Sequence, residues 1–222
     1  KNVSSRDCVM PAVPMFHANA WSLTFTCPMS GAKMVMPGPK LDGASVCELL
    51  INEKVTMSAA VPTIWFMLLQ HLEANPDIRL PDLERVAIGG SSCPESLMRA
   101  FKTKYGVDVV HAWGMTETSP LATVCQPKGS LAHLGEEELW KQRVKQGRAL
   151  FGVEMKLTDG EDNLLAQDGK SFGHLKVRGP WIANSYFKGD GVKAFGTGGW
   201  FDTGDVSTID EPSGRAVPGA RS

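Results

Sequence analysis

Short apolar runs alternate with helical segments along the first half of this 222-residue chain, and no other feature constrains the fold as much. The runs have the length and composition of buried strands. Because a helical segment separates each run from the next, a crossover connection joins them, which favours a largely parallel sheet flanked by helices. The predicted strands are residues 9–13, 33–36, 56–60, 85–88 and 107–110.

Apolar residues recur at helical spacing between these strands. The clearest helix is expected to begin at Pro62, and its stripe is expected to be packed core. A second helix is expected to open at Asp42-Gly43, and Ser92 and Glu95 stand at capping-box spacing before a third. The stripe of the clearest helix consists of Ile64, Trp65, Leu68, Leu69 and Leu72.

Four loops follow predicted strands. In a sheet with right-handed connections, the carboxyl ends of successive parallel strands meet at one edge, where ligands bind. We therefore expect the four loops to line one crevice. They are residues 14–17, 61–63, 89–93 and 113–117.

The most reactive-looking stretch is 111–120, which reads His-Ala-Trp-Gly-Met-Thr-Glu-Thr-Ser-Pro. It brings an aromatic ring, a glycine, hydroxyls and a carboxylate together just beyond a predicted strand. Loops of this kind carry function more often than the strands that hold them. A plain surface turn is the alternative.

The sequence changes in character after Pro120. We expect an α/β subdomain over residues 1–125 and a connecting segment over 126–146, with a charged helix from 136. Glycine and short alternating runs then predict a smaller β-rich, barrel-like subdomain over 147–211. Residues 212–222 are expected to form a disordered tail.

Composition excludes several classes of protein. The net charge of −1 gives no electrostatic basis for binding nucleic acid or an anionic membrane. No apolar run is long enough for a transmembrane segment, and the first residues do not resemble a signal peptide, so we expect a cytoplasmic protein. The five cysteines lack metal-ligand spacing and are expected to be reduced thiols.

Two short motifs suggest other chemistry. Gly169-Lys170-Ser171 resembles the end of a phosphate-binding loop, but Leu164 stands where the first glycine is required. The turn before Pro94 resembles a nucleophile elbow with Ser91 at its tip, although Cys93 stands where the elbow needs glycine. A serine hydrolase with Ser91 as nucleophile is therefore a contrasting hypothesis.

Five motifs in a fixed order carry a more specific resemblance. Together they resemble the acyl-adenylate-forming enzymes, in particular an internal fragment of the large N-terminal domain of acyl-CoA synthetases (fatty-acid–CoA ligases). The resemblance runs to about Asp210. The motifs are Pro14-Met15-Phe16-His17, residues 89–92, residues 113–117, residues 173–179 and Gly199-Trp200-Phe201-Asp202-Thr203-Gly204-Asp205.

The resemblance implies a reaction and its participants. Such a ligase activates a carboxylic acid, here a fatty acid, with ATP to an acyl-adenylate and pyrophosphate, and then transfers the acyl group to coenzyme A. ATP/AMP, Mg²⁺ and coenzyme A as substrate are therefore expected, and the partners are these small molecules, with a homodimer left open. A non-catalytic AMP- or acyl-binding module is the second reading.

The resemblance also assigns roles to residues. Trp113 would stack on adenine, and Asp205 would accept hydrogen bonds from the ribose hydroxyls. Phe16, Trp21, Val61 and Met115 are candidate walls of the acyl pocket. The expected nucleotide-binding set is Gly90, Ser91, Ser92, Trp113, Gly114, Met115, Thr116 and Asp205.

Three residues would take part in catalysis. Thr116 would bond a phosphate oxygen, and Glu117 would hold Mg²⁺, which prefers one or two carboxylates plus phosphate oxygens. His17 would lie beside the acyl carboxylate and the route of the thiol.

The chain departs from the family pattern in two respects. Gly173-His174-Leu175 stands where the family shows Gly-Glu-Leu. The family's phosphate loop and its catalytic lysine find no counterpart in the sequence, although such groups stabilise the charge that develops during reaction. The fragment alone is therefore predicted to be inactive, while the parent protein is active.

Overall fold

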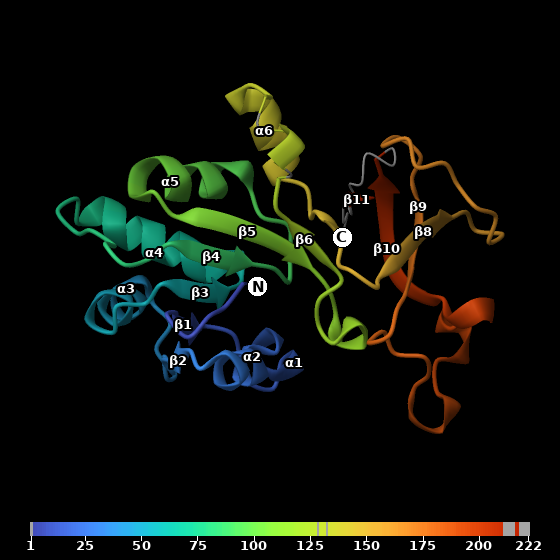
Figure 1. Ribbon diagram of the computed structural model, residues 1–222, viewed down its shortest axis with the longest axis horizontal. Helices are drawn as coiled ribbons and strands as arrows, with labels where there is room; N and C mark the ends of the chain where they lie inside the picture. The colour runs from blue at the N-terminus through green and yellow to red at the C-terminus, as the bar shows by residue number, and fades with distance from the viewer. Residues whose placement is uncertain (1, 128, 132, 211–215, 218–222) are drawn as a thin grey trace. The chain divides into compact units, whose positions relative to one another are not determined.

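The computed structural model describes residues 2–127, 129–131, 133–210 and 216–217 (Figure 1). Its strands form a seven-stranded sheet in the order β2-β1-β3-β4-β5-β6-β7 and a four-stranded sheet in the order β11-β10-β9-β8. The chain divides into two compact units, Lys1–Val110 and His111–Ser222.

The first unit contains the parallel strands. β1 pairs with β2 on one side and with β3 on the other, and β3 pairs with β4, all in parallel. The predicted largely parallel sheet is confirmed. The strands are β1 (Cys8–Pro11), β2 (Lys33–Met34), β3 (Met57–Ala60) and β4 (Arg85–Ile88), and the helices are α1 (Ala18–Trp21), α2 (Leu23–Ser30), α3 (Gly43–Asn52), α4 (Pro62–Ala74) and α5 (Glu95–Tyr105).

Helix α4 forms as its sequence predicts. Pro62 lies in its first turn, where a missing N–H costs no hydrogen bond. Trp65 is fully buried and meets the ring of Phe101 from α5 edge to face, with the ring centroids 5.7 Å apart. Helix α3 approaches α4 closely, because a Cβ at Gly43 would lie 2.2 Å from the backbone oxygen of Met67. The two helices therefore require glycine at this point.

Helix α5 begins later than predicted. The expected capping box of Ser92 and Glu95 does not form: Pro94 precedes the helix with an extended backbone and no side-chain cap. A proline biases the residue before it away from helical dihedral angles, so a helix starting at Ser92 would have to pass through Cys93 against that bias.

The second unit is mostly antiparallel. β6 pairs antiparallel with β5 and β7, and β9 pairs antiparallel with β8 and β10. The predicted β-rich segment is confirmed. Its elements are β5 (Asp108–Trp113, which begins in the first unit), β6 (Thr123–Cys125), α6 (Glu136–Arg143), β7 (Arg148–Ala149), β8 (Glu154–Thr158), β9 (Gly173–Arg178), β10 (Phe201–Ile209) and β11 (Ala216–Val217), with short 3₁₀ turns that include η1 (Thr116–Thr118).

Strand β5 is longer than predicted. Its residues His111, Ala112 and Trp113 pair with β6, so Trp113 ends a strand rather than opening a loop. Strands β6, β7 and β10 are not predicted by the sequence pattern. The first two are very short, and glycine inside β10 masks its alternation.

The predicted subdomain boundaries stay predictions. Helix α6 lies inside the expected connecting segment, 126–146. Of the expected disordered tail, Ala216–Val217 pair with β10, and the other tail residues lie outside the described ranges. Within those ranges, no helix combines the length and apolar character needed to cross a membrane.

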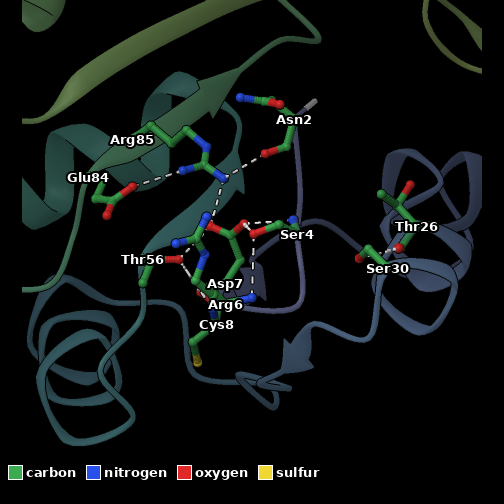
Figure 2. Close-up of polar contacts among 10 residues, drawn as sticks. All are labelled: Asn2, Ser4, Arg6, Asp7, Cys8, Thr26, Ser30, Thr56, Glu84 and Arg85. Carbon is green, nitrogen blue, oxygen red and sulfur yellow. Dashed lines mark hydrogen bonds and ion pairs between the residues drawn. The ribbon is translucent and has the colours of Figure 1, made fainter.

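A polar cluster joins the amino ends of β1, β3 and β4 (Figure 2). The carboxylate of Asp7, 8% exposed, accepts hydrogen bonds from the Thr56 hydroxyl at 2.8 Å and from Arg85 Nη2 at 2.7 Å. Ser4 donates to its other oxygen through its backbone N–H and its hydroxyl. Burial alone would raise the pKa of Asp7, but these hydrogen bonds and the Arg85 charge outweigh it and hold the pKa below its usual 3.8.

Replacing Asp7 with alanine removes the acceptor that these strand ends share. We expect Asp7→Ala to lower the free energy of unfolding by about 3–5 kcal/mol at neutral pH, because the Arg85 guanidinium is left without its buried partner. Urea unfolding of this chain measures the change.

Glu73→Ala is the matched control, because it breaks only the exposed pair with Lys104 and should change stability little. A carboxyl whose pKa is lowered by folding stabilises the protein above its unfolded pKa. That contribution is lost as the pH falls through the folded value, so the difference between wild type and Asp7→Ala should shrink below about pH 3.8. An unchanged difference there contradicts this account.

Candidate functional site

Two of the loops of the first unit that were predicted to converge, 61–63 and 89–93, lie against each other. A Cβ built on Gly90, which follows β4, would lie 3.4 Å from Val61 Cγ1 and 3.8 Å from Trp21 Cζ2. Val61 follows β3, and Trp21 is the last residue of α1. The carboxyl edge of these strands therefore carries a backbone turn closely packed between an aromatic and an aliphatic side chain.

The polar residues expected in this unit lie at its surface. His17, Ser91 and Ser92 are exposed. Beside His17, Phe16 is 90% exposed, which is unusual for a phenylalanine. After His17 the backbone takes left-handed dihedral angles from Ala18 to Ser22, a conformation that costs energy for residues with a side chain.

The geometry around Ser91 does not form a hydrolase site. Within the described residues, no hydrogen bond joins Ser91 to a histidine or a carboxylate, whereas a nucleophilic serine needs a base within reach. Cys93 is no substitute, because burial raises the pKa of its thiol to about 12.

In the second unit, the two residues predicted to hold the nucleoside are hydrogen-bonded to each other. The indole Nε1 of Trp113 donates to Asp205 Oδ2 at 2.8 Å, although the residues are 92 positions apart. The Trp113 ring is 8% exposed and belongs to the core of the unit. In this structure, the Trp113 ring therefore packs in the core while its N–H donates a hydrogen bond to Asp205.

Asp205 owes its position to a bulge in β10. The register of β10 against β9 shifts between Asp202 and Val206, and Gly204 has a φ of +76°. The Thr203 hydroxyl donates to Leu175 O at 2.9 Å and accepts from Asp205 N at 3.1 Å. Bulges turn side chains out of the regular alternation, and this one turns Asp205 toward Trp113.

The loop after Trp113 folds back tightly on itself. A Cβ at Gly114 would lie 1.8 Å from the backbone oxygen of Pro120, so only glycine fits. The buried Thr118 hydroxyl accepts a hydrogen bond from Met115 N and donates one to Met115 O, both at 2.9 Å. Between these fixed points, Thr116 is exposed and Glu117 is half-buried.

Glu117 is held by a residue that the sequence analysis did not identify. Tyr186 donates its hydroxyl hydrogen bond to Glu117 Oε1 at 2.6 Å across 69 positions, and Ala183 N donates to Glu117 O at 2.8 Å. The hydrogen bond to the Glu117 carboxylate, with burial, raises the pKa of Tyr186. No local pattern marks Tyr186, because its partner is distant in sequence.

The residues present fit Mg²⁺ held mainly by a nucleotide. Within the described residues, no group of three or more His, Cys, Asp or Glu could hold a metal ion. Glu117 offers one carboxylate, whose Oε1 is engaged by Tyr186. Mg²⁺ commonly binds through one or two carboxylates and completes its coordination with phosphate oxygens and water.

Comparison with known proteins gives one consistent family. The family model described as AMP-binding enzyme matches residues 1–187. A 3-methylmercaptopropionyl-CoA ligase from Ruegeria lacuscaerulensis is 49% identical over 93% of this chain, and a medium-chain-fatty-acid–CoA ligase from Ectopseudomonas oleovorans is 45% identical over 94%. The chain spans only 38% of the length of each relative.

A solved structure has a similar fold over nearly the whole chain. The o-succinylbenzoate coenzyme A synthetase from Bacillus subtilis, in complex with ATP and magnesium ion, is 25% identical with a TM-score of 0.77. The match covers 97% of this chain and 42% of that one.

Gly114→Ala tests the fold of the loop. The added methyl group cannot fit against the Pro120 backbone, so we expect a loss of about 2 kcal/mol or more in the free energy of unfolding. Gly160→Ala is the control, because its Cβ would meet nothing within 4 Å, and it should change stability by less than about 0.5 kcal/mol. Equal stability of the two variants would show that the loop is not packed as described.

Proposed function

The chain belongs to the AMP-binding enzymes, and from that premise we propose that the whole protein is an AMP-forming acid–CoA ligase. It activates a carboxylic acid with ATP and transfers the acyl group to coenzyme A. The names of the two relatives support this activity, since both are CoA ligases.

One hydrogen bond between two predicted site residues supports the proposal most directly. The Trp113–Asp205 hydrogen bond joins an aromatic residue and a carboxylate from two distant motifs. Oδ2 of Asp205 is engaged by the indole N–H, and an ionised carboxylate has further acceptor capacity for ribose hydroxyls. The same bond fixes Trp113, the residue proposed to contact the adenine, beside Asp205.

The predicted catalytic residues, Thr116, Glu117 and His17, suit the two steps of the reaction. In the first step, a carboxylate oxygen of the acid attacks the α-phosphorus, and pyrophosphate leaves with the electrons of the broken P–O bond. Thr116 is exposed and can donate to a phosphate oxygen, and Mg²⁺ at Glu117 would supply positive charge to the phosphates. In the second step, the thiol sulfur of coenzyme A attacks the acyl carbon, AMP leaves with the electrons of the broken acyl C–O bond, and the thiol proton is released; His17 is expected to lie beside this route.

The first unit supports an acid with an apolar tail. Phe16 and Val61 are exposed apolar side chains, and Val61 and Trp21 both lie against Gly90. A fatty or similarly apolar acid could bury them. Gly90, Ser91 and Ser92 stay predicted nucleotide contacts of the first unit, and Gly114 and Met115 stay predicted nucleotide contacts of the second.

A cytoplasmic location belongs to the same proposal. All five cysteines are buried thiols, the state that reducing compartments maintain. Assembly as a homodimer stays a prediction.

The reaction tests the proposal directly. We expect the whole protein to release pyrophosphate only when ATP and an apolar carboxylic acid are both present. The 222-residue chain alone should show no such turnover, because the sequence holds no counterpart of the family's phosphate loop and lysine. Pyrophosphate release across a panel of acids measures both, and robust turnover by the chain alone refutes the second expectation.

A non-catalytic nucleotide-binding module is the second candidate for the isolated chain. The Trp113–Asp205 pair lies entirely within it, so AMP affinity without turnover is the expected behaviour.

Substitution of Asp205 separates a ribose contact from a structural role. We expect Asp205→Asn to weaken AMP binding by about 10-fold or more, since hydrogen bonds to charged groups contribute about 1.5–3 kcal/mol. Binding of an AMP analogue that lacks both ribose hydroxyls should change much less. Calorimetry on this chain measures both affinities, with Asp202→Asn as the neighbouring control, and equal losses for the two ligands would argue against a ribose contact.

A further inference from the structure

We propose that Tyr186 is a positioning residue for Glu117: its hydroxyl fixes one carboxylate oxygen and leaves the other directed to the divalent cation. This inference rests on the proposed function and extends it to a residue outside the five motifs. Its basis is the way one segment of the second unit is tied to the loop after β5.

Four hydrogen bonds tie residues 181–186 to residues 117–121. Two of them go to Glu117: the Tyr186 hydroxyl donates to Oε1 at 2.6 Å, and Ala183 N donates to the backbone oxygen at 2.8 Å. The Ser119 hydroxyl donates to Trp181 O at 2.8 Å, and Trp181 Nε1 donates to Leu121 O at 3.2 Å. Both the backbone and the carboxylate of Glu117 are therefore held from the same segment.

The Tyr186 ring is itself anchored. It meets Phe195 edge to face with centroids 5.2 Å apart, and Phe195 lies 5.2 Å from the buried ring of Phe201. A Cβ at Gly191 would lie 2.7 Å from Tyr186 Cδ2, so the backbone closes over the ring. The phenol cannot swing away from Glu117 without disturbing these aromatic contacts.

A carboxylate held in this way loses little freedom when it binds a cation. Unsupported, the Glu117 side chain samples several rotamers, and only some present an oxygen to the phosphates. Partners that orient metal ligands typically change metal affinity or activity 10- to 100-fold when they are removed. Phenylalanine at position 186 keeps the aromatic packing and removes only the hydroxyl.

The test compares ATP binding with Mn²⁺ and with EDTA, measured by calorimetry on this chain. In wild type, Mn²⁺ should strengthen ATP binding. Glu117→Gln should abolish that enhancement, and Tyr186→Phe should reduce it about 10-fold, while ATP affinity in EDTA stays unchanged. Tyr105→Phe is the matched control, because the chain has two tyrosines and Tyr105 lies on α5.

The outcomes separate the inference from the proposed function. If Glu117→Gln loses the enhancement and Tyr186→Phe keeps it, the positioning role is overturned and the proposed function stands. If Tyr186→Phe weakens ATP binding equally with Mn²⁺ and with EDTA, its role is structural, and the inference is also overturned. If wild type shows no enhancement, or Glu117→Gln retains it, the metal role of Glu117 is refuted and the inference falls with it.

A second measurement leaves Tyr186 in place. In chain labelled with 3-fluorotyrosine, Mn²⁺ with ATP should broaden the ¹⁹F resonance of Tyr186, because its hydroxyl touches the cation's ligand. The broadening should disappear in Glu117→Gln. An unbroadened Tyr186 signal under conditions where Mn²⁺ enhances ATP binding contradicts the inference.

Discussion

The hydrogen bond between Trp113 and Asp205 is the interaction on which the candidate site of the second unit depends. It joins the end of β5 to a bulge in β10, two strands of different sheets that are 92 positions apart in sequence. A glycine lies next to each of the two residues. Gly114 allows the loop after Trp113 to pack against the Pro120 backbone, and Gly204 adopts the positive φ of the bulge that redirects Asp205.

The stabilising polar cluster and the residues proposed to bind ligands lie at opposite ends of the parallel strands. At the amino ends, the buried carboxylate of Asp7 accepts hydrogen bonds from Ser4, Thr56 and Arg85. At the carboxyl ends, the turn at Gly90 leaves exposed hydroxyls and apolar rings instead. Buried polar groups that are hydrogen-bonded stabilise a fold. Exposed apolar side chains and unpaired hydroxyls, in contrast, can gain free energy when a ligand covers them.

Much of the fold could be predicted from the sequence because its signals are local. The strand positions and the apolar stripe of α4 follow from periodicity, and the parallel sheet follows from the alternation of strands and helices. The extension of β5 to Trp113 depends on pairing with β6, which periodicity cannot show. The capping-box spacing of Ser92 and Glu95 predicts too early a start for α5, because Pro94 lies between them and disfavours helical dihedral angles at Cys93.

The same distinction applies to the site. The sequence motifs identify Trp113, Glu117 and Asp205 as candidate site residues, and the structure brings Trp113 and Asp205 into contact. Tyr186 could not be found in this way, since its role arises from a hydrogen bond across 69 positions and from aromatic packing behind it. Residues that orient others carry no motif of their own.

A crystal structure of this chain with AMP tests the central claim most directly. Adenine is expected to lie against Trp113, and both ribose hydroxyls are expected to lie within hydrogen-bonding distance of the Asp205 carboxylate. AMP bound elsewhere, or with its ribose turned away from Asp205, would contradict it.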